Sequence, residues 1–123
     1  SFINLSFLFR NKLKAEKLLQ FNDTEYKARM SLDTIIRIEQ ALNCSILKLG
    51  NKLAQADITM SEIISIVTLA IRAGGNNIQE KDVKGLIAEI GLLEAIKIAG
   101  ELVTLALNVD DDTDDEKKSP VEE

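Results

Sequence analysis

GLLEAIKIAGELVTLAL, residues Gly91–Leu107, is the most apolar stretch of this chain, and we expect the other elements to pack around it. Its polar residues recur along one line of a helix, at Glu94, Lys97, Glu101, Thr104 and Asn108. The apolar positions cover the rest of the circumference, which a helix tolerates only when neighbours surround it. They are Leu92, Leu93, Ala95, Ile96, Ile98, Ala99, Leu102, Val103, Leu105 and Ala106.

Three charges in seventeen residues argue against a membrane span. Gly100, costly inside a helix, suggests a close helix crossing. The stretch predicts a central core helix.

The charge of the chain is divided unevenly. The net charge is −5, but residues 109–123 hold eight acidic and two basic residues, which leaves thirteen basic and twelve acidic residues in 1–108. The body is therefore almost neutral and lacks the basic face expected of a DNA-binding protein. The acidic residues 109–123, with few apolar groups, predict a disordered tail that aids solubility or engages a basic partner surface.

Histidine is absent and Cys44 is the single cysteine. The commonest general base and the commonest metal ligand are therefore missing, and no disulfide can form within the chain. A small buried hydrophobic residue is the expected role for Cys44. We predict no enzyme activity, no cofactor, no metal site and no small-molecule substrate, in a protein of a reducing compartment such as the cytoplasm.

Residues 1–11 form an apolar N-terminal extension that begins SFINLSFLF. Its basic residues follow the apolar run, the reverse of a secretory signal, and the run is too short to span a bilayer. An extra strand, a docked arm, a start extended beyond the usual domain and a patch that pairs with another subunit all remain open.

Residues 12–108 are expected to form one mainly α domain of about four to five helices with an N-terminal β-hairpin. The hairpin strands are predicted at Lys14–Phe21 and Tyr26–Met30, around a turn at residues 22–25, where asparagine and aspartate favour tight turns. Ser31 is a predicted N-cap for a helix at Leu32–Leu42, which Asn43 ends. Its inward residues are predicted to be Leu32, Ile35, Ile36, Ile38 and Leu42. A shorter helix follows Ser45, although Gly50 weakens it.

The third predicted helix has the clearest amphipathic pattern. Thr59 and Glu62 have capping-box spacing, and the helix that they open ends at Gly74–Gly75, where a positive φ is expected. Asn77–Glu80 repeats the capping-box spacing before a helix with Val83, Leu86, Ile87 and Ile90 inward. Gly91 then breaks the chain before the central helix.

Three short patterns invite functional interpretations that their details oppose. Asp110, Asp112 and Asp114 alternate as in a calcium loop, but Asp115 and Val121 stand where that loop needs glycine and glutamate. Gly74–Gly75 follows a helix, whereas a phosphate-binding loop follows a strand. The carboxylates of Glu94 and Glu101 flank Lys97, which is typical of surface ion pairing.

As an ordered pattern, Lys14–Leu107 resembles a phage tail assembly family that includes a gene of the gene transfer agents. The pattern consists of a polar hairpin, the helix LDTIIRIEQAL at Leu32–Leu42, the turn LAIRAGG at Leu69–Gly75, the segment Ile78–Val83 and the break Gly91-Leu92. The apolar extension and the acidic tail depart from it.

The resemblance implies a non-enzymatic tail assembly chaperone that binds the tape-measure protein or other tail proteins in the bacterial cytoplasm. The alternative is a structural tail tube or tail-associated protein that self-assembles, and a homo-oligomer is compatible with both. A third reading is a small helical regulator whose acidic tail binds a basic partner. No nucleic acid or membrane partner is expected. Arg72, Gly74 and Gly75 are the candidate partner-binding residues, with a helix cap as the competing explanation.

Overall fold

The computed structural model describes residues 15–122, with side chains described to Asn108. It contains strands β1 (Glu16–Phe21) and β2 (Thr24–Arg29) and helices α2 (Leu32–Leu42), α3 (Ile46–Ala54), α4 (Met60–Ala73), α5 (Glu80–Ile90) and α6 (Leu92–Glu122). This confirms a mainly α domain with an N-terminal hairpin. The apolar extension, residues 1–11, lies outside the described residues.

The two strands form an antiparallel hairpin joined by Asn22 and Asp23 alone. Asn22 takes the left-handed conformation, with φ 56°, that asparagine tolerates. The predicted four-residue turn was therefore too long, since Thr24 and Glu25 already pair with Phe21 and Gln20. One face of the hairpin buries Leu19, Phe21, Ala28 and Met30, which face the helices.

Caps fix most helix ends where the sequence places them. Ser31 and Ser45 accept backbone N–H groups at the starts of α2 and α3, and Asn43 ends α2 with φ 50°. The Thr59–Glu62 capping box opens α4 as predicted. The second predicted box was wrong, because α5 begins at Glu80, and Gln79, not Asn77, precedes it as the cap. A carboxylate oxygen of Asp82 accepts the Gln79 N–H at 3.1 Å.

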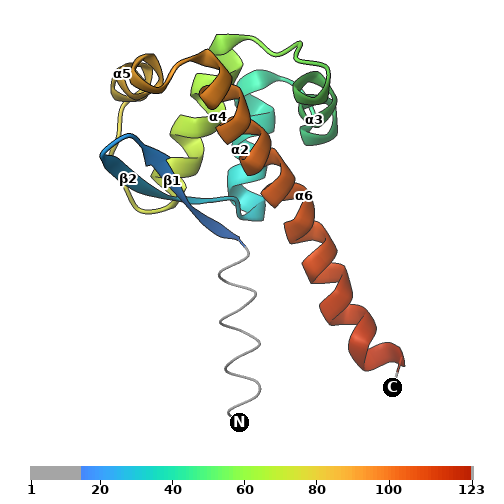
Figure 1. Ribbon diagram of the computed structural model, residues 1–123. Helices are drawn as coiled ribbons and strands as arrows, with labels where there is room; N and C mark the ends of the chain where they lie inside the picture. The colour runs from blue at the N-terminus through green and yellow to red at the C-terminus, as the bar shows by residue number, and fades with distance from the viewer. Residues whose placement is uncertain (1–14, 123) are drawn as a thin grey trace.

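Helices α4 and α6 together occupy the centre. In Figure 1, α6 crosses in front of α2 and α4, with the hairpin on one side and α3 on the other. Helix α6 contacts α2, α3, α4, α5 and β1, while α4 contacts β2, α2, α5 and α6. The buried residues of α6 are Ala95, Ile98, Ala99, Leu102, Val103 and Ala106, and those of α4 are Ile63, Ile66, Val67, Thr68, Ala70 and Ile71. The predicted central helix is confirmed, but it shares this role with α4.

Several apolar residues predicted to face inward are exposed. Leu92 and Leu93, in the first turn of α6, are 60% and 85% exposed. Leu32 and Ile36 of α2 are also exposed, and Thr34 is buried in their place. Apolar periodicity identifies a helix face but does not say how far the neighbouring elements cover it.

The backbone of α6 continues through the acidic residues to Glu122. This part of the helix extends beyond the rest of the domain in Figure 1. The disorder of residues 109–123 that their composition suggests stays a prediction.

Candidate protein-interaction surfaces

The predicted candidates Arg72, Gly74 and Gly75 lie together at the end of α4. The Arg72 Nε donates a hydrogen bond of 2.8 Å to the Ile78 carbonyl, across the loop that leads to α5. The Gly74 N–H caps α4 through the Ala70 carbonyl at 3.1 Å. The positive φ falls on Gly75, at 101°. These contacts order the α4–α5 connection, and partner binding by the three residues stays a prediction.

Gly74 also marks the closest approach between α4 and the hairpin. A Cβ atom at this position would lie 2.0 Å from the Lys27 carbonyl oxygen and 3.2 Å from the Ala28 Cα. The Asn76 side-chain amide donates to the same Lys27 carbonyl at 3.0 Å and to the Ile71 carbonyl at 3.2 Å. The crossing predicted at Gly100 was wrong, because a Cβ there would meet no described atom within 4 Å.

Arg72 contributes to a second feature, a pocket of about 240 Å³ where α2, α4 and the end of β2 meet. Arg29 comes from β2, Arg37 from α2 and Arg72 from α4, so three arginines line one concavity. The other residues that line this arginine pocket are Ser31, Asp33, Thr34, Leu69 and Ala73. Asp33 is thus the one acidic residue against three basic ones.

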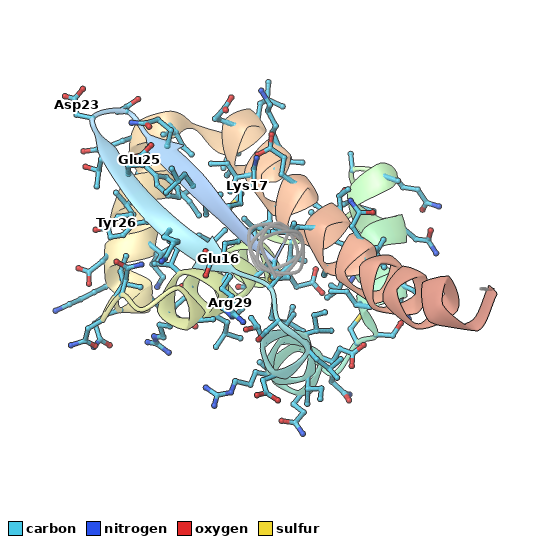
Figure 2. All side chains as sticks on the ribbon, turned by 90° about the horizontal axis from the view of Figure 1, so that it is seen from below. Glu16, Lys17, Asp23, Glu25, Tyr26 and Arg29 are labelled. Carbon is cyan, nitrogen blue, oxygen red and sulfur yellow. The ribbon has the colours of Figure 1, made fainter. Side chains whose placement is uncertain are left out.

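The three guanidinium groups differ in the ion pairs and hydrogen bonds that they already form with the described residues. Arg29 pairs with Glu16 across the hairpin at 3.0 Å, and both labels lie at the hairpin end next to α2 in Figure 2. Arg72 uses its Nε on a carbonyl, while its terminal nitrogens make no described hydrogen bond. Arg37 forms no ion pair with any described side chain. The pocket can therefore accept a carboxylate, for which a guanidinium offers two parallel donors.

A larger open groove of about 740 Å³ runs between α3 and α6. Gly50 and Gly100 lie in it without side chains, and Leu47, 66% exposed, stands at its edge. Its other apolar residues are Leu53, Ala54, Val103, Leu105 and Leu107. Lys17 of β1 also lines the groove, and Figure 2 shows it on the side of the hairpin that faces α6. Apolar side chains with a polar rim are typical of a surface that receives an amphipathic helix.

The best-formed ion pair is structural. The Lys52 Nζ of α3 lies 2.6 Å from the Glu62 Oε2 of α4, and the Glu62 Oε1 accepts a hydrogen bond of 2.9 Å from the Thr59 N–H. The hydrogen bond from Lys52 and then that from the Thr59 backbone lower the pKa of the Glu62 carboxyl, and the bond to Glu62 raises the pKa of Lys52. Both shifts arise from mutual stabilisation of the charged forms, which links α3 to the start of α4.

Residues 14–109 match the family model described as phage tail tube protein, GTA-gp10. The chain belongs to this family. The match covers the hairpin and all five described helices as far as the start of the acidic segment, so it includes both the arginine pocket and the groove. The apolar extension and nearly all of the acidic segment lie outside it. No curated protein and no solved structure matches the chain.

Metal-binding clusters and membrane-spanning helices are both absent from the described part of this tail-family domain. Among these residues no group of three or more histidine, cysteine, aspartate or glutamate side chains could hold a metal ion. None of the described helices has the length and apolar character needed to cross a membrane. Cys44 is half-buried against the core, consistent with the packing role expected of it. The remaining candidate sites are the pocket and the groove, both suited to protein partners.

Sequence reasoning found Arg72 but missed the other pocket residues. Arg29 and Arg37 stand far from Arg72 in the chain, and each is unremarkable in its own segment. Of the groove leucines, Leu105 was expected in the core and Leu47 was not singled out, since periodicity alone could not show that α3 and α6 leave a space between them.

Proposed function

We propose that this chain is a non-enzymatic structural protein of a phage tail, which acts during tail assembly through contacts with copies of itself and with other tail proteins. The family match over residues 14–109 carries the proposal, because the family is described as tail tube protein. The bacterial cytoplasm, where tails assemble, is the proposed location.

The surface supports a role in assembly. Large apolar side chains are exposed on the hairpin, on α2, on α3 and at the start of α6, at Leu18, Leu32, Ile36, Leu47, Leu92 and Leu93. Because these elements face different directions, one copy has apolar surface for more than one neighbour (Figure 1). Within this set, the pairs Leu32 with Ile36 and Leu92 with Leu93 lie on the same helix turn and are the candidate apolar contacts for neighbouring copies.

The test is the composition of finished particles. Tails purified from cells that express the whole tail gene set should contain this chain in an amount comparable to the known repeating subunits, by quantitative mass spectrometry. The purified chain should also form assemblies in sedimentation velocity. A chain that is absent from washed particles and sediments as a monomer would refute the structural role.

A second candidate function is a tail assembly chaperone that holds the tape-measure protein. Two observations favour it. The described sheet has only two strands, fewer than a β-rich tube subunit would have. The groove between α3 and α6 has the apolar lining with a polar rim that suits an amphipathic helix. Under this hypothesis the chain binds an amphipathic helix transiently and leaves before the particle is complete.

Co-expression with the tape-measure protein distinguishes the two candidates. The chaperone hypothesis predicts a soluble complex by pull-down and size-exclusion chromatography, together with absence from finished particles. Leu47→Asp places a charge at the groove and should abolish capture. Leu93→Asp, at a leucine that is 85% exposed against 66% for Leu47 but lies outside the groove residues, is the control and should retain capture. Equal capture by both variants would exclude the groove as the binding site.

A further inference from the structure

We propose that the arginine pocket of one copy binds the acidic segment Asp110–Asp115 of a second copy. This inference rests on the self-association proposed above and names the contact that would produce it. The binding site is formed by Arg29, Arg37 and Arg72, and the ligand is a run of carboxylates on a neighbouring copy of the same chain.

The pocket provides donors that the rest of the described domain leaves available. Arg37 has no described ion-pair partner, and the terminal nitrogens of Arg72 make no described hydrogen bond. The Arg72 Nε bond to Ile78 holds its guanidinium at the pocket, so little side-chain freedom remains to be lost on binding. The N-terminus of α2, capped by Ser31, opens at the same place and adds a partial positive charge.

Charge complementarity selects the ligand. Residues 109–123 carry eight acidic and two basic residues, and the aspartates at 110, 111, 112, 114 and 115 concentrate that charge in one short run. Residues 15–108, in contrast, hold ten basic and twelve acidic residues. The arginine pocket, lined by three arginines and one aspartate, has a local excess of positive charge that complements this acidic run. Opposite charges that meet across an interface set register and association rate.

The direction of α6 favours a second copy over the same chain. The helix continues past the domain to Glu122, and about fourteen residues at 1.5 Å each place its end about 21 Å beyond Asn108. In Figure 1 this part leads away from α2 and α4, which line the pocket. Two copies that exchange tails reciprocally form a closed dimer, whereas a tail of each copy in the pocket of the next forms a ring if the rotation closes and an open filament if it does not.

Sedimentation velocity of the full chain, with variants of each side of the contact, tests the inference. Arg37→Gln should weaken self-association at least about tenfold, the loss expected for one charge-assisted hydrogen-bonded pair. Lys84→Gln on α5 removes the same charge from an exposed position outside the pocket and should leave self-association unchanged. Replacing the five aspartates by asparagine should weaken it at least as much as Arg37→Gln, and raising the salt concentration from 50 to 500 mM should do the same through screening.

The variant that combines Arg37→Gln with the five aspartate substitutions tests whether the two groups contact each other. If Arg37 and the aspartates meet in one contact, the chain with both changes associates no more weakly than the aspartate variant alone, since the effects of residues in contact are not additive. Circular dichroism of each variant checks that the fold is retained.

Four other outcomes contradict the inference in different ways. Assemblies that are unaffected by either change would overturn this contact and leave the structural role intact. Additive effects would place the two groups in separate contacts and also overturn it. A monomer at every concentration, with the chain absent from particles, would remove both the inference and the proposed function. If the chain stays monomeric and its sedimentation coefficient changes with the salt concentration, the acidic segment binds the pocket of its own chain. That result would refute binding to a second copy.

Discussion

Gly74→Ala should destabilise the domain even though the backbone at Gly74 suits alanine. With φ −78° and ψ 1°, Gly74 has an ordinary right-handed conformation. Conformational entropy alone therefore predicts that alanine stabilises the fold by about 0.4–1 kcal/mol. Packing predicts the reverse, because the new Cβ would lie 2.0 Å from the Lys27 carbonyl oxygen and 2.7 Å from its carbon.

The magnitude follows from what has to move. Both clashing atoms belong to the backbone of β2, so no side-chain rotation relieves the contact. The end of α4 and the hairpin must separate by about 1 Å, which loosens the burial of Ala28 and Ile71. Overpacking of this kind costs about 1–3 kcal/mol. After the entropic gain is subtracted, we expect a net loss of about 1–2 kcal/mol and a fall in Tm of about 4–8 °C.

Thermal unfolding followed by circular dichroism at 222 nm, with urea titration for the free energy of unfolding, measures the effect. Gly85→Ala is the matched control: it lies in α5 with no described atom within 4 Å of its Cβ, so alanine should stabilise by about 0.5–1 kcal/mol. Adding Lys27→Ala to Gly74→Ala should not restore the lost stability, since the clash involves the backbone of Lys27. A Tm for Gly74→Ala that rises with the Gly85→Ala control, or a rescue by Lys27→Ala, would refute the close approach.

Three further predictions concern other parts of the fold. Thr68→Val should raise the free energy of unfolding by about 1 kcal/mol, because the buried Thr68 hydroxyl has no hydrogen-bond partner among the described residues and costs desolvation; unchanged or lower stability in urea titration would show that the hydroxyl is satisfied. Glu62→Gln should lower Tm at pH 7, and the difference in Tm from the parent should shrink as the pH falls below 4.5. A carboxyl whose pKa is lowered in the folded state stabilises the fold above its unfolded pKa. It loses that contribution as the pH falls through its folded pKa. A difference that grows on acidification would contradict the assigned direction. Removal of residues 109–123 should change Tm by no more than about 2 °C, since Ala106 is the last buried residue among the side chains described, which extend to Asn108. A larger loss in the same melt would place the acidic segment in the folding unit.

Local signals in the sequence sufficed for much of the fold. Ser31 and Asn43 fix both ends of α2 at the predicted residues, because a side-chain cap and a left-handed asparagine act on their own neighbours. Gly91, with φ 91°, separates α5 from α6 as expected. The pattern of Gly91–Leu107 also predicted the exposed line of α6, with Glu101 partly covered by Lys17 at 3.9 Å.

Features that depend on distant pairs could not be predicted in this way. The exposure of Leu92 and Leu93 depends on where the neighbouring elements end, and the importance of Gly74 depends on a strand more than forty residues earlier. The same limit applies to the arginine pocket, because Arg29, Arg37 and Arg72 belong to three elements that no short window contains. Only Arg72 was singled out, and for the turn that follows it.

The close approach at Gly74 links stability to the proposed interface. Gly74 packs against Lys27 and Ala28, directly before Arg29, and follows Arg72 by two residues, so the same contact brings Arg29 and Arg72 to one pocket. A separation of about 1 Å in Gly74→Ala should therefore weaken self-association as well as stability. Gly75→Ala strains a φ of 101° but adds no contact within 4 Å, so it should reduce stability while the arginine spacing is kept. At a temperature where both variants are folded, weaker self-association in Gly74→Ala alone would connect the pocket to the packing of α4 on β2, whereas equal association in the two variants would separate them.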